Sequence, residues 1–182
     1  PDALQRMYHA LERSLTGRVA VKISTGEPGG HNFLQPSLIR GLVEELQGTI
    51  VECNTAYAGR RNTTGEHWKA IAEHGFLDIA PCDIMDEDGT VMLPVKGGKW
   101  FREMSMGKNI LNYDSMLVLT HFKGHTKGGF GGSNKNIGIG CADGRIGKAM
   151  IHTTPGSSDM WDIGKEEFME RMTESAKAVV DH

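Results

Sequence analysis

The sequence predicts an α/β fold in which a mainly parallel sheet is flanked by helices in Rossmann-like layers. Short β-rich runs at residues 19–23, 49–53 and 115–120 alternate with segments whose apolar residues follow helical spacing. This alternation is typical of βαβ units, which build parallel sheets with helices on their faces. We expect a single domain over residues 1–182, because this length suits one full-sized domain.

Helices are expected in four segments, each with its own start or stop signal. The first spans residues 4–15, and the second begins at Pro36, because proline is common at the first helical position. A T-x-x-E capping box starts the third helix at Thr63, and Gly75 closes it. The last helix runs from about residue 165.

A β-hairpin insertion is expected between the third helix and the last strand. Residues 83–85 and 91–95 are short apolar runs around a turn at residues 86–89, and Pro94 marks the second run as an edge strand. The run at residues 115–120 is the most apolar of all, which favours a strand buried on both faces.

Composition is that of a soluble globular protein and limits the partners of the chain. Hydrophobic residues make up 38% and charged residues 24% of the sequence. The net charge of -3 gives no general attraction to nucleic acid or to anionic membranes. The sequence has neither a signal peptide nor a membrane-length apolar run, so we expect a cytoplasmic protein.

The three cysteines, Cys53, Cys82 and Cys141, lie far apart and form no CxxC pair. This spacing argues against a disulfide framework and against a self-contained zinc or iron–sulfur site. The chain opens on Pro1 and stops soon after a helix-like segment, so we expect it to be a fragment of a longer protein.

Polar loops follow the predicted strands at residues 24–32, 54–64 and 121–140. Because ligands of parallel sheets bind beyond the carboxyl ends of the strands, we expect these loops to meet at one rim. The third loop is rich in glycine and lysine, and a helix starting near Ser133 would add amide groups that favour an anion. Its expected ligand contacts are Lys123, Gly128, Gly129, Gly131, Gly132, Lys135 and Asn136. The alternative is a flexible surface loop whose lysines only aid solubility.

Histidines and arginines supply two further candidate sites. His121, His125 and His152 suit a transition metal such as nickel, zinc or iron if they converge, although lone histidines are more often capping or packing residues. His152 closes a short β-like run. Arg60, followed by Arg61, is a candidate clamp for a carboxylate or phosphate, and the alternative is a solvated turn.

Three segments carry a resemblance to a known family: VAVKISTGE (residues 19–27), YAGRRNTTGEHWKAIAEHGF (57–76) and VLTHFKGHTKGGFGGSNKNIGIG (118–140). The chain resembles domain-of-unknown-function family 362, often labelled iron–sulfur centre protein. The resemblance implies an electron-transfer protein whose 4Fe-4S cluster belongs to a ferredoxin-like domain of the same polypeptide, outside these 182 residues. The present domain would hold a small anionic or nucleotide-like ligand at the loop of residues 121–140.

A more distant resemblance, to the amino-terminal region of nickel-pincer lactate racemases, implies a different function. In that pattern a histidine, a glycine-rich loop, a lysine and a second histidine follow one another. The matching residues imply an acid–base role for His125, a covalent cofactor anchor in Lys135 and a nickel ligand in His152. The alternative function is therefore a metal- and cofactor-dependent racemase or isomerase. A third alternative is a scaffold that docks a protein partner and binds no small ligand.

Overall fold

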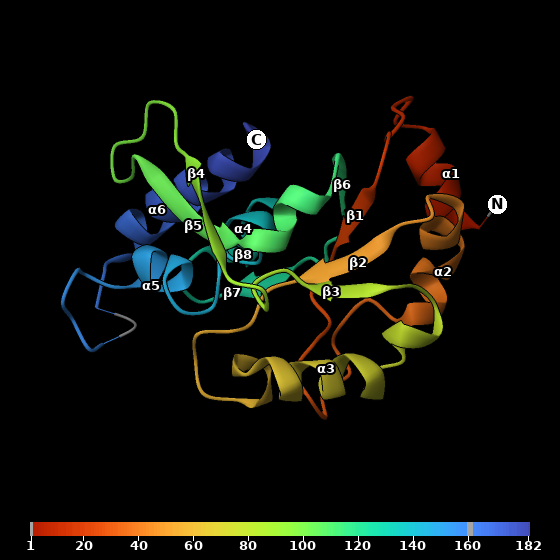
Figure 1. Ribbon diagram of the computed structural model, residues 1–182, viewed down its shortest axis with the longest axis horizontal. Coiled ribbons are helices and arrows are strands. Elements are labelled where there is room, and N and C mark those ends of the chain that lie inside the picture. The colour runs from red at the N-terminus through yellow and green to blue at the C-terminus, as the bar shows by residue number, and fades with distance from the viewer. Residues whose placement is uncertain (1, 160–161) are drawn as a thin grey trace.

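The computed structural model describes residues 2–159 and 162–182, and it shows the predicted α/β fold. A four-stranded, all-parallel sheet has the strand order β3-β2-β1-β6 (Figure 1). The strands of this sheet are β1 (Val19–Lys22), β2 (Thr49–Glu52), β3 (Cys82–Ile84) and β6 (Ser115–Val118).

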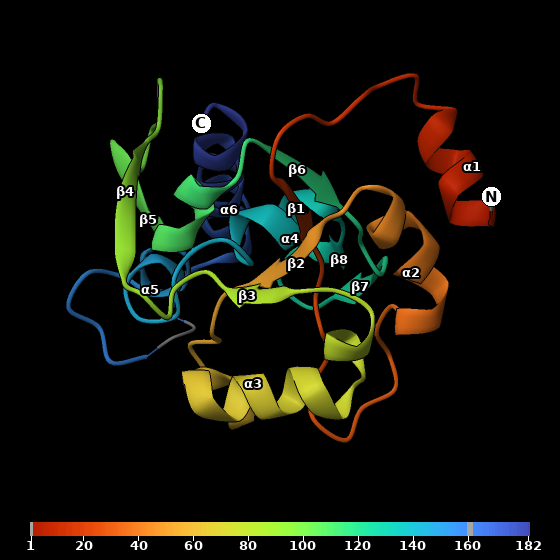
Figure 2. The ribbon, with the colours of Figure 1, turned by 45° about the vertical axis from the view of Figure 1, so that its right-hand side comes forward.

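Helices cover both faces of the sheet (Figures 1 and 2). One face carries α2 (Pro36–Glu45) and α3 (Thr64–Glu73), and the other carries α4 (Ser133–Gly138), α5 (Gly147–His152) and α6 (Lys165–Val180). Side chains alternate between the two faces along a strand. In β1, Val19 and Val21 therefore join the core under α2 and α3, whereas Ala20 joins the core under α4 to α6.

The remaining elements are short. They are α1 (Ala3–His9), the 3-10 helices η1 (Arg60–Asn62), η2 (Phe76–Asp78) and η3 (Lys108–Asn112), and two antiparallel hairpins. One hairpin pairs β4 (Thr90–Pro94) with β5 (Glu103–Gly107), and the other pairs β7 (Lys123–His125) with β8 (Gly129–Gly131). The first hairpin packs beside α6, and the second lies just after β6.

Most of the predicted helix signals are confirmed. Pro36 is the first residue of α2, and Gly75 takes a left-handed conformation with φ of 80° directly after α3. The last helix begins at Lys165 as expected. The capping box at Thr63 is wrong, because this side chain makes no cap hydrogen bond and Glu66 is bound by Arg60 and Lys69 instead.

The first helix is shorter than predicted. It ends at His9 rather than near residue 15, and none of its residues is buried. The helix begins with a capping box that was not predicted. The side chain of Asp2 accepts a hydrogen bond from the backbone amide of Gln5 at 2.9 Å. Gln5 also donates to the carbonyl of Gly41 in α2, so α1 is held at the surface by polar contacts.

The predicted hairpin partner and the predicted burial of residues 115–120 on both faces are both wrong. Residues 82–84 form β3 of the main sheet, and β4 pairs with β5 instead. Asp86, expected in the turn, accepts hydrogen bonds from the backbone amides of Asn54 and Gly144 and fixes the chain beside β2. The apolar strand β6 is an edge strand with half-buried residues, because α4 and α6 shield only part of it.

The closest packing between helices occurs where α4 meets α6. A β-carbon on Gly138 would lie 2.5 Å from the carbonyl oxygen of Met172 and 3.2 Å from the amide of Ala176. The hydroxyl of Ser175 donates to the carbonyl of Gly138 across the same contact. The absence of a side chain at this position therefore sets the distance of α4 from α6.

Replacing Gly138 by alanine is expected to destabilise the fold, because the added methyl group meets backbone atoms that cannot rotate away. The expected loss is about 1–3 kcal/mol in the free energy of unfolding, measured by urea denaturation. Gly65→Ala in α3 is the matched control, since a β-carbon there meets open space, and it should leave stability unchanged or raise it slightly. Equal effects of the two substitutions would contradict the packing argument.

Candidate functional site

The loops that follow β1, β2 and β6 meet, as the sequence predicts, and line one cavity of about 320 Å³. The loop after β1 contributes Ser24, and the loop after β2 contributes Tyr57 and Arg61. The segment after β6 contributes the histidine and lysine side chains of the β7–β8 hairpin and the start of α4. The cavity therefore lies at the carboxyl ends of the strands, where ligands of parallel sheets bind.

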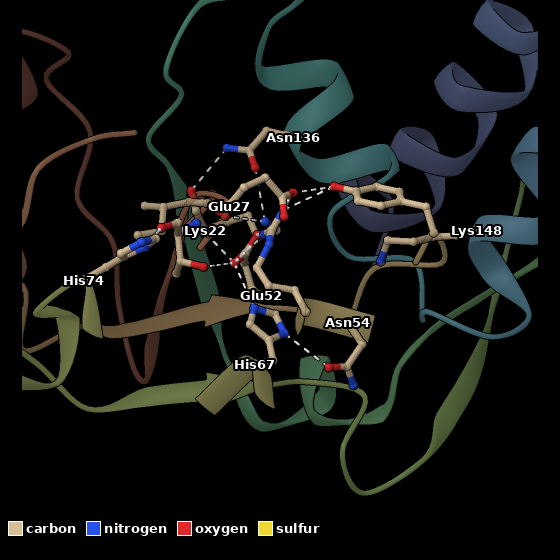
Figure 3. A network of polar contacts seen from close by, with 12 residues as sticks. Lys22, Glu27, Glu52, Asn54, His67, His74, Asn136 and Lys148 are labelled. Carbon is tan, nitrogen blue, oxygen red and sulfur yellow. Dashed lines mark hydrogen bonds and ion pairs between the residues drawn. The ribbon is translucent and has the colours of Figure 1, made fainter. Parts of the chain in front are cut away.

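A buried carboxylate, that of Glu52 at the end of β2, organises one wall of the cavity (Figure 3). It accepts hydrogen bonds from the backbone amide and hydroxyl of Thr25, from Arg61 at 3.1 Å and from His67 at 3.2 Å. Burial raises the pKa of Glu52, but the charges and hydrogen bonds of Arg61 and His67 outweigh it and hold the pKa well below its usual range. Glu52 is therefore ionised and joins three segments of the chain.

Buried Lys22 and half-buried Asn136 form the floor of the cavity, where β1, β6 and α4 come together. The Lys22 ammonium donates to the carbonyl of Ile23 at 2.5 Å and to the side-chain oxygen of Asn136 at 3.1 Å. The Asn136 amide in turn donates to the carbonyl of Leu119 at 3.1 Å. Asn136, predicted as a ligand contact, lines the cavity and also ties α4 to two strands.

A lysine without a partner, Lys135, faces the same cavity from α4. Within the described residues its ammonium makes no hydrogen bond or ion pair. Burial, together with the nearby charges of Lys123 and Lys22, lowers the pKa of Lys135 to about 8. Lys148 of α5 is buried as well, and its ammonium donates to the carbonyl of Ala142 at 2.6 Å.

The predicted glycines divide into two pairs. Gly131 and Gly132 line the cavity, and a β-carbon on Gly131 would lie 3.5 Å from Lys123 and 3.8 Å from Lys135. Gly128 ends the turn of the β7–β8 hairpin and Gly129 begins β8 with a φ of 71°, and neither is among the lining residues. The first pair leaves room beside the lysines, whereas the second pair shapes the hairpin.

The three candidate metal ligands, His121, His125 and His152, all line the cavity but form no metal site. No group of three or more histidine, cysteine or acidic side chains is placed to hold a metal ion within residues 2–159 and 162–182. His125 accepts a hydrogen bond from the Gly128 amide, and His152 donates one to the carbonyl of Lys148. Burial lowers the pKa of His152 to about 4, which keeps it neutral at pH 7. The expected strand before His152 is the helix α5.

Of the two arginines in the predicted clamp, Arg61 lines the cavity and Arg60 does not. Arg60 points away from the cavity lining and pairs with Glu66 at 3.1 Å and Glu73 at 2.7 Å. Arg61 is buried, lines the cavity and pairs with Glu52. Consecutive residues of the short 3-10 helix η1 project in different directions, so only one of the two arginines reaches the site.

Lys22, Glu52 and Lys148 line the cavity but were not predicted from the sequence as site residues. A usable signal existed for the first two, since each is a charged residue inside an otherwise apolar β-strand. A charge at such a position is rarely buried unless it is paired or functional. Lys148 offered no such signal, because its short helix shows no clear apolar pattern.

Substituting Glu52 by glutamine is expected to destabilise the protein strongly. The change leaves the buried guanidinium of Arg61 without its buried counter-charge, which typically costs about 3–5 kcal/mol. Thermal and urea unfolding would measure the loss. Glu66→Gln is the matched control, because this exposed carboxylate also pairs with an arginine and should leave the unfolding temperature close to that of the wild type. A mild effect at Glu52 would mean that the buried network is not a determinant of stability.

Comparisons with known proteins identify the family of the chain but no individual relative. No curated protein and no solved structure matches the chain. In the part of the chain that the structure describes, no helix is both long and apolar enough to cross a bilayer. The model of the family described as "Domain of unknown function (DUF362)" matches residues 19–182, a span that holds the whole sheet and every residue of the cavity. The chain therefore belongs to the DUF362 family.

Proposed function

We propose that this domain binds a small anionic ligand or a nucleotide-like cofactor in the cavity at the carboxyl ends of the strands. The observation that carries the proposal is the charge of the lining. Five basic side chains line the cavity, namely Lys22, Arg61, Lys123, Lys135 and Lys148. Glu52 is the sole carboxylate among the described lining residues, and it is already paired with Arg61.

The burial of these cations strengthens the argument. Lys22 and Lys148 are 0% and 5% exposed, and their ammonium groups donate hydrogen bonds to neutral carbonyl and amide oxygens. Placing a cation in a poorly solvated site is costly unless a negative group accompanies it. A bound carboxylate or phosphate would supply that negative charge. Solubility does not account for this arrangement, because buried lysines do not contribute to the surface charge.

A redox role is the finer part of the proposal and rests on the family resemblance stated above. The 4Fe-4S cluster would belong to a ferredoxin-like domain of the same cytoplasmic polypeptide, and the ligand held here would exchange electrons with it. The cysteines of this domain do not fit a cluster: Cys53 and Cys141 are buried, and the thiol of Cys53 donates to the carbonyl of Cys141. Burial also raises the pKa of both thiols, so they disfavour the thiolate form that ligates iron.

Sulfate affinity should fall as the pH rises through about 8, because Lys135 loses its positive charge near its lowered pKa of about 8. Sulfate is a suitable probe since it remains a dianion throughout this range. Binding would be measured by calorimetry at constant ionic strength between pH 6.5 and 9.5, with a decline of at most about tenfold per pH unit for one linked proton.

In Lys135→Ala the affinity should be lower and this pH step should be lost. Lys69→Ala is the control, because Lys69 is exposed, pairs with Glu66 and lies outside the cavity; it should behave as the wild type. Absence of sulfate binding by the wild type, or unchanged binding by Lys135→Ala, would count against an anion site at this position.

A second candidate function is favoured by one observation, the unpartnered and half-buried amine of Lys135. An amine with a lowered pKa is partly neutral near pH 8 and is then a nucleophile, which suits a covalent cofactor anchor in a racemase or isomerase. The nickel site of that reading does not fit, since the three cavity histidines form no metal-binding group among the described residues. Only the covalent part of this alternative is therefore retained.

Intact-mass measurement tests the covalent alternative. Protein purified from a host that makes the cofactor should carry an added mass, which is absent in Lys135→Ala and present in Lys123→Ala. Lys123 is the matched control because it lines the same cavity but is exposed. An unmodified wild-type mass would leave reversible anion binding as the function of the cavity.

A further inference from the structure

We infer that the ligand carries two anionic groups and that Arg61 and Tyr57 form a second anion subsite in the cavity. The carboxylate of Glu27 occupies this subsite in the structure, and one anionic group of the ligand displaces it. This inference rests on the proposed function, because it describes the ligand of the same cavity. The first anionic group would lie near the unpartnered Lys135, and the second would take the place of Glu27.

The contacts of the Glu27 carboxylate show how Tyr57 and Arg61 bind an anion beside the cavity. It accepts hydrogen bonds from the Tyr57 hydroxyl at 2.5 Å and from the Arg61 guanidinium. Both donors line the cavity, whereas Glu27 itself is not among the lining residues. Burial raises the pKa of Glu27, but the hydrogen bonds from Arg61 and Tyr57 outweigh it and lower the pKa, so Glu27 binds there as an anion.

The two carboxylates that contact Arg61 differ in burial. The side chain of Glu52 is 7% exposed and is held by Thr25 and His67 as well, whereas the side chain of Glu27 is 50% exposed. Side-chain bonds to Glu27 come from Arg61 and Tyr57 only, within the described residues. Glu52 is therefore a fixed part of the wall, and Glu27 is the partner that a ligand could replace without exposing a buried charge.

The loop that carries Glu27 is packed against Phe33 at Gly26 and is open on the other side of Glu27, at Gly29. It lies between β1 and α2, and glycines with positive φ stand on both sides of Glu27, at Gly26 (87°) and Gly29 (75°). A β-carbon on Gly29 would meet no atom within 4 Å, so this part of the loop is loosely packed. Residues in short loops of this kind absorb the dihedral changes of ligand-driven rearrangements.

Polar atoms of the same wall remain unused when Glu27 is in place. Nε of Arg61 and Oγ1 of Thr55 are buried and have no hydrogen-bond partner among the described residues, and Thr55 also lines the cavity. Buried polar groups without partners are rare in native proteins, and each requires an explanation. A ligand carboxylate or phosphate would bring oxygens to this wall that Glu27 does not provide.

Glu27 therefore acts as a competing anion within the chain. A tethered carboxylate competes like a free one at an effective concentration of about 1 mM or more. A ligand with a single anionic group can bind beside Lys135 and leave Glu27 in place. A dicarboxylate or a phosphorylated carboxylate engages both subsites, and its affinity includes the cost of displacing Glu27.

Titration of the wild type and of single-substitution variants with succinate tests the inference. In Glu27→Gln, which keeps the size of the side chain but removes its charge, succinate should bind at least about threefold more tightly than in the wild type, as expected when a tethered competitor is removed. Glu73→Gln is the matched control, because it removes an exposed carboxylate from the neighbouring Arg60 outside the cavity and should leave succinate affinity unchanged. Calorimetry at constant ionic strength would measure both, and thermal unfolding would confirm that the variants are folded.

A second variant separates a subsite from a merely structural contact. If the Tyr57 hydroxyl passes from Glu27 to the ligand, then adding Tyr57→Phe to Glu27→Gln should reverse the gain in succinate affinity. Unchanged or weaker succinate binding in Glu27→Gln, with sulfate still bound, would overturn the second subsite and leave the proposed function standing. If neither sulfate nor succinate binds to the wild type or to Glu27→Gln, the proposed function fails and the inference fails with it.

Discussion

The ion pair between Glu52 and Arg61 is the interaction on which the arrangement of the site depends. Glu52 ends the strand β2, Arg61 comes from the loop after it, and Thr25 and His67 bring the loop after β1 and the helix α3 to the same carboxylate. A buried ion pair contributes little net stability compared with apolar packing, but it is demanding in geometry because unpaired charges are costly. Its role here is to fix two loops and a helix against one another at the rim of the sheet.

The remaining charges of the rim have a common sign and few partners. Within the described residues, Lys22 and Lys148 donate hydrogen bonds to neutral oxygens, and Lys135 has no partner. The Glu52–Arg61 pair is internally neutral, so it does not cancel this excess. The fold thus holds several cations close together, although the charges of Lys22 and Lys148 help to lower the pKa of Lys135.

The sequence allowed the architecture to be predicted because periodicity and helix signals are local. The strands β1 and β2, the proline start of α2 and the glycine end of α3 all follow from neighbouring residues. Strand order did not follow, since an apolar run such as β6 looks the same at an edge as at the centre. Long-range pairing also decided that β4 joins β5.

The candidate site was predictable as a meeting of loops and less so as individual side chains. The rule that strand ends share one rim brought Lys123, Lys135 and Asn136 into the cavity. The choice between Arg60 and Arg61 depends on the turn of η1, which a sequence does not display.

The floor of the cavity has a further consequence for biosynthesis. Lys22 and Asn136 are 114 positions apart, so a nascent chain that has left the ribosome only as far as β3 contains the carboxylate wall and lacks α4 altogether. The complete cavity floor can therefore form only late in translation, and an amino-terminal half of the domain lacks it.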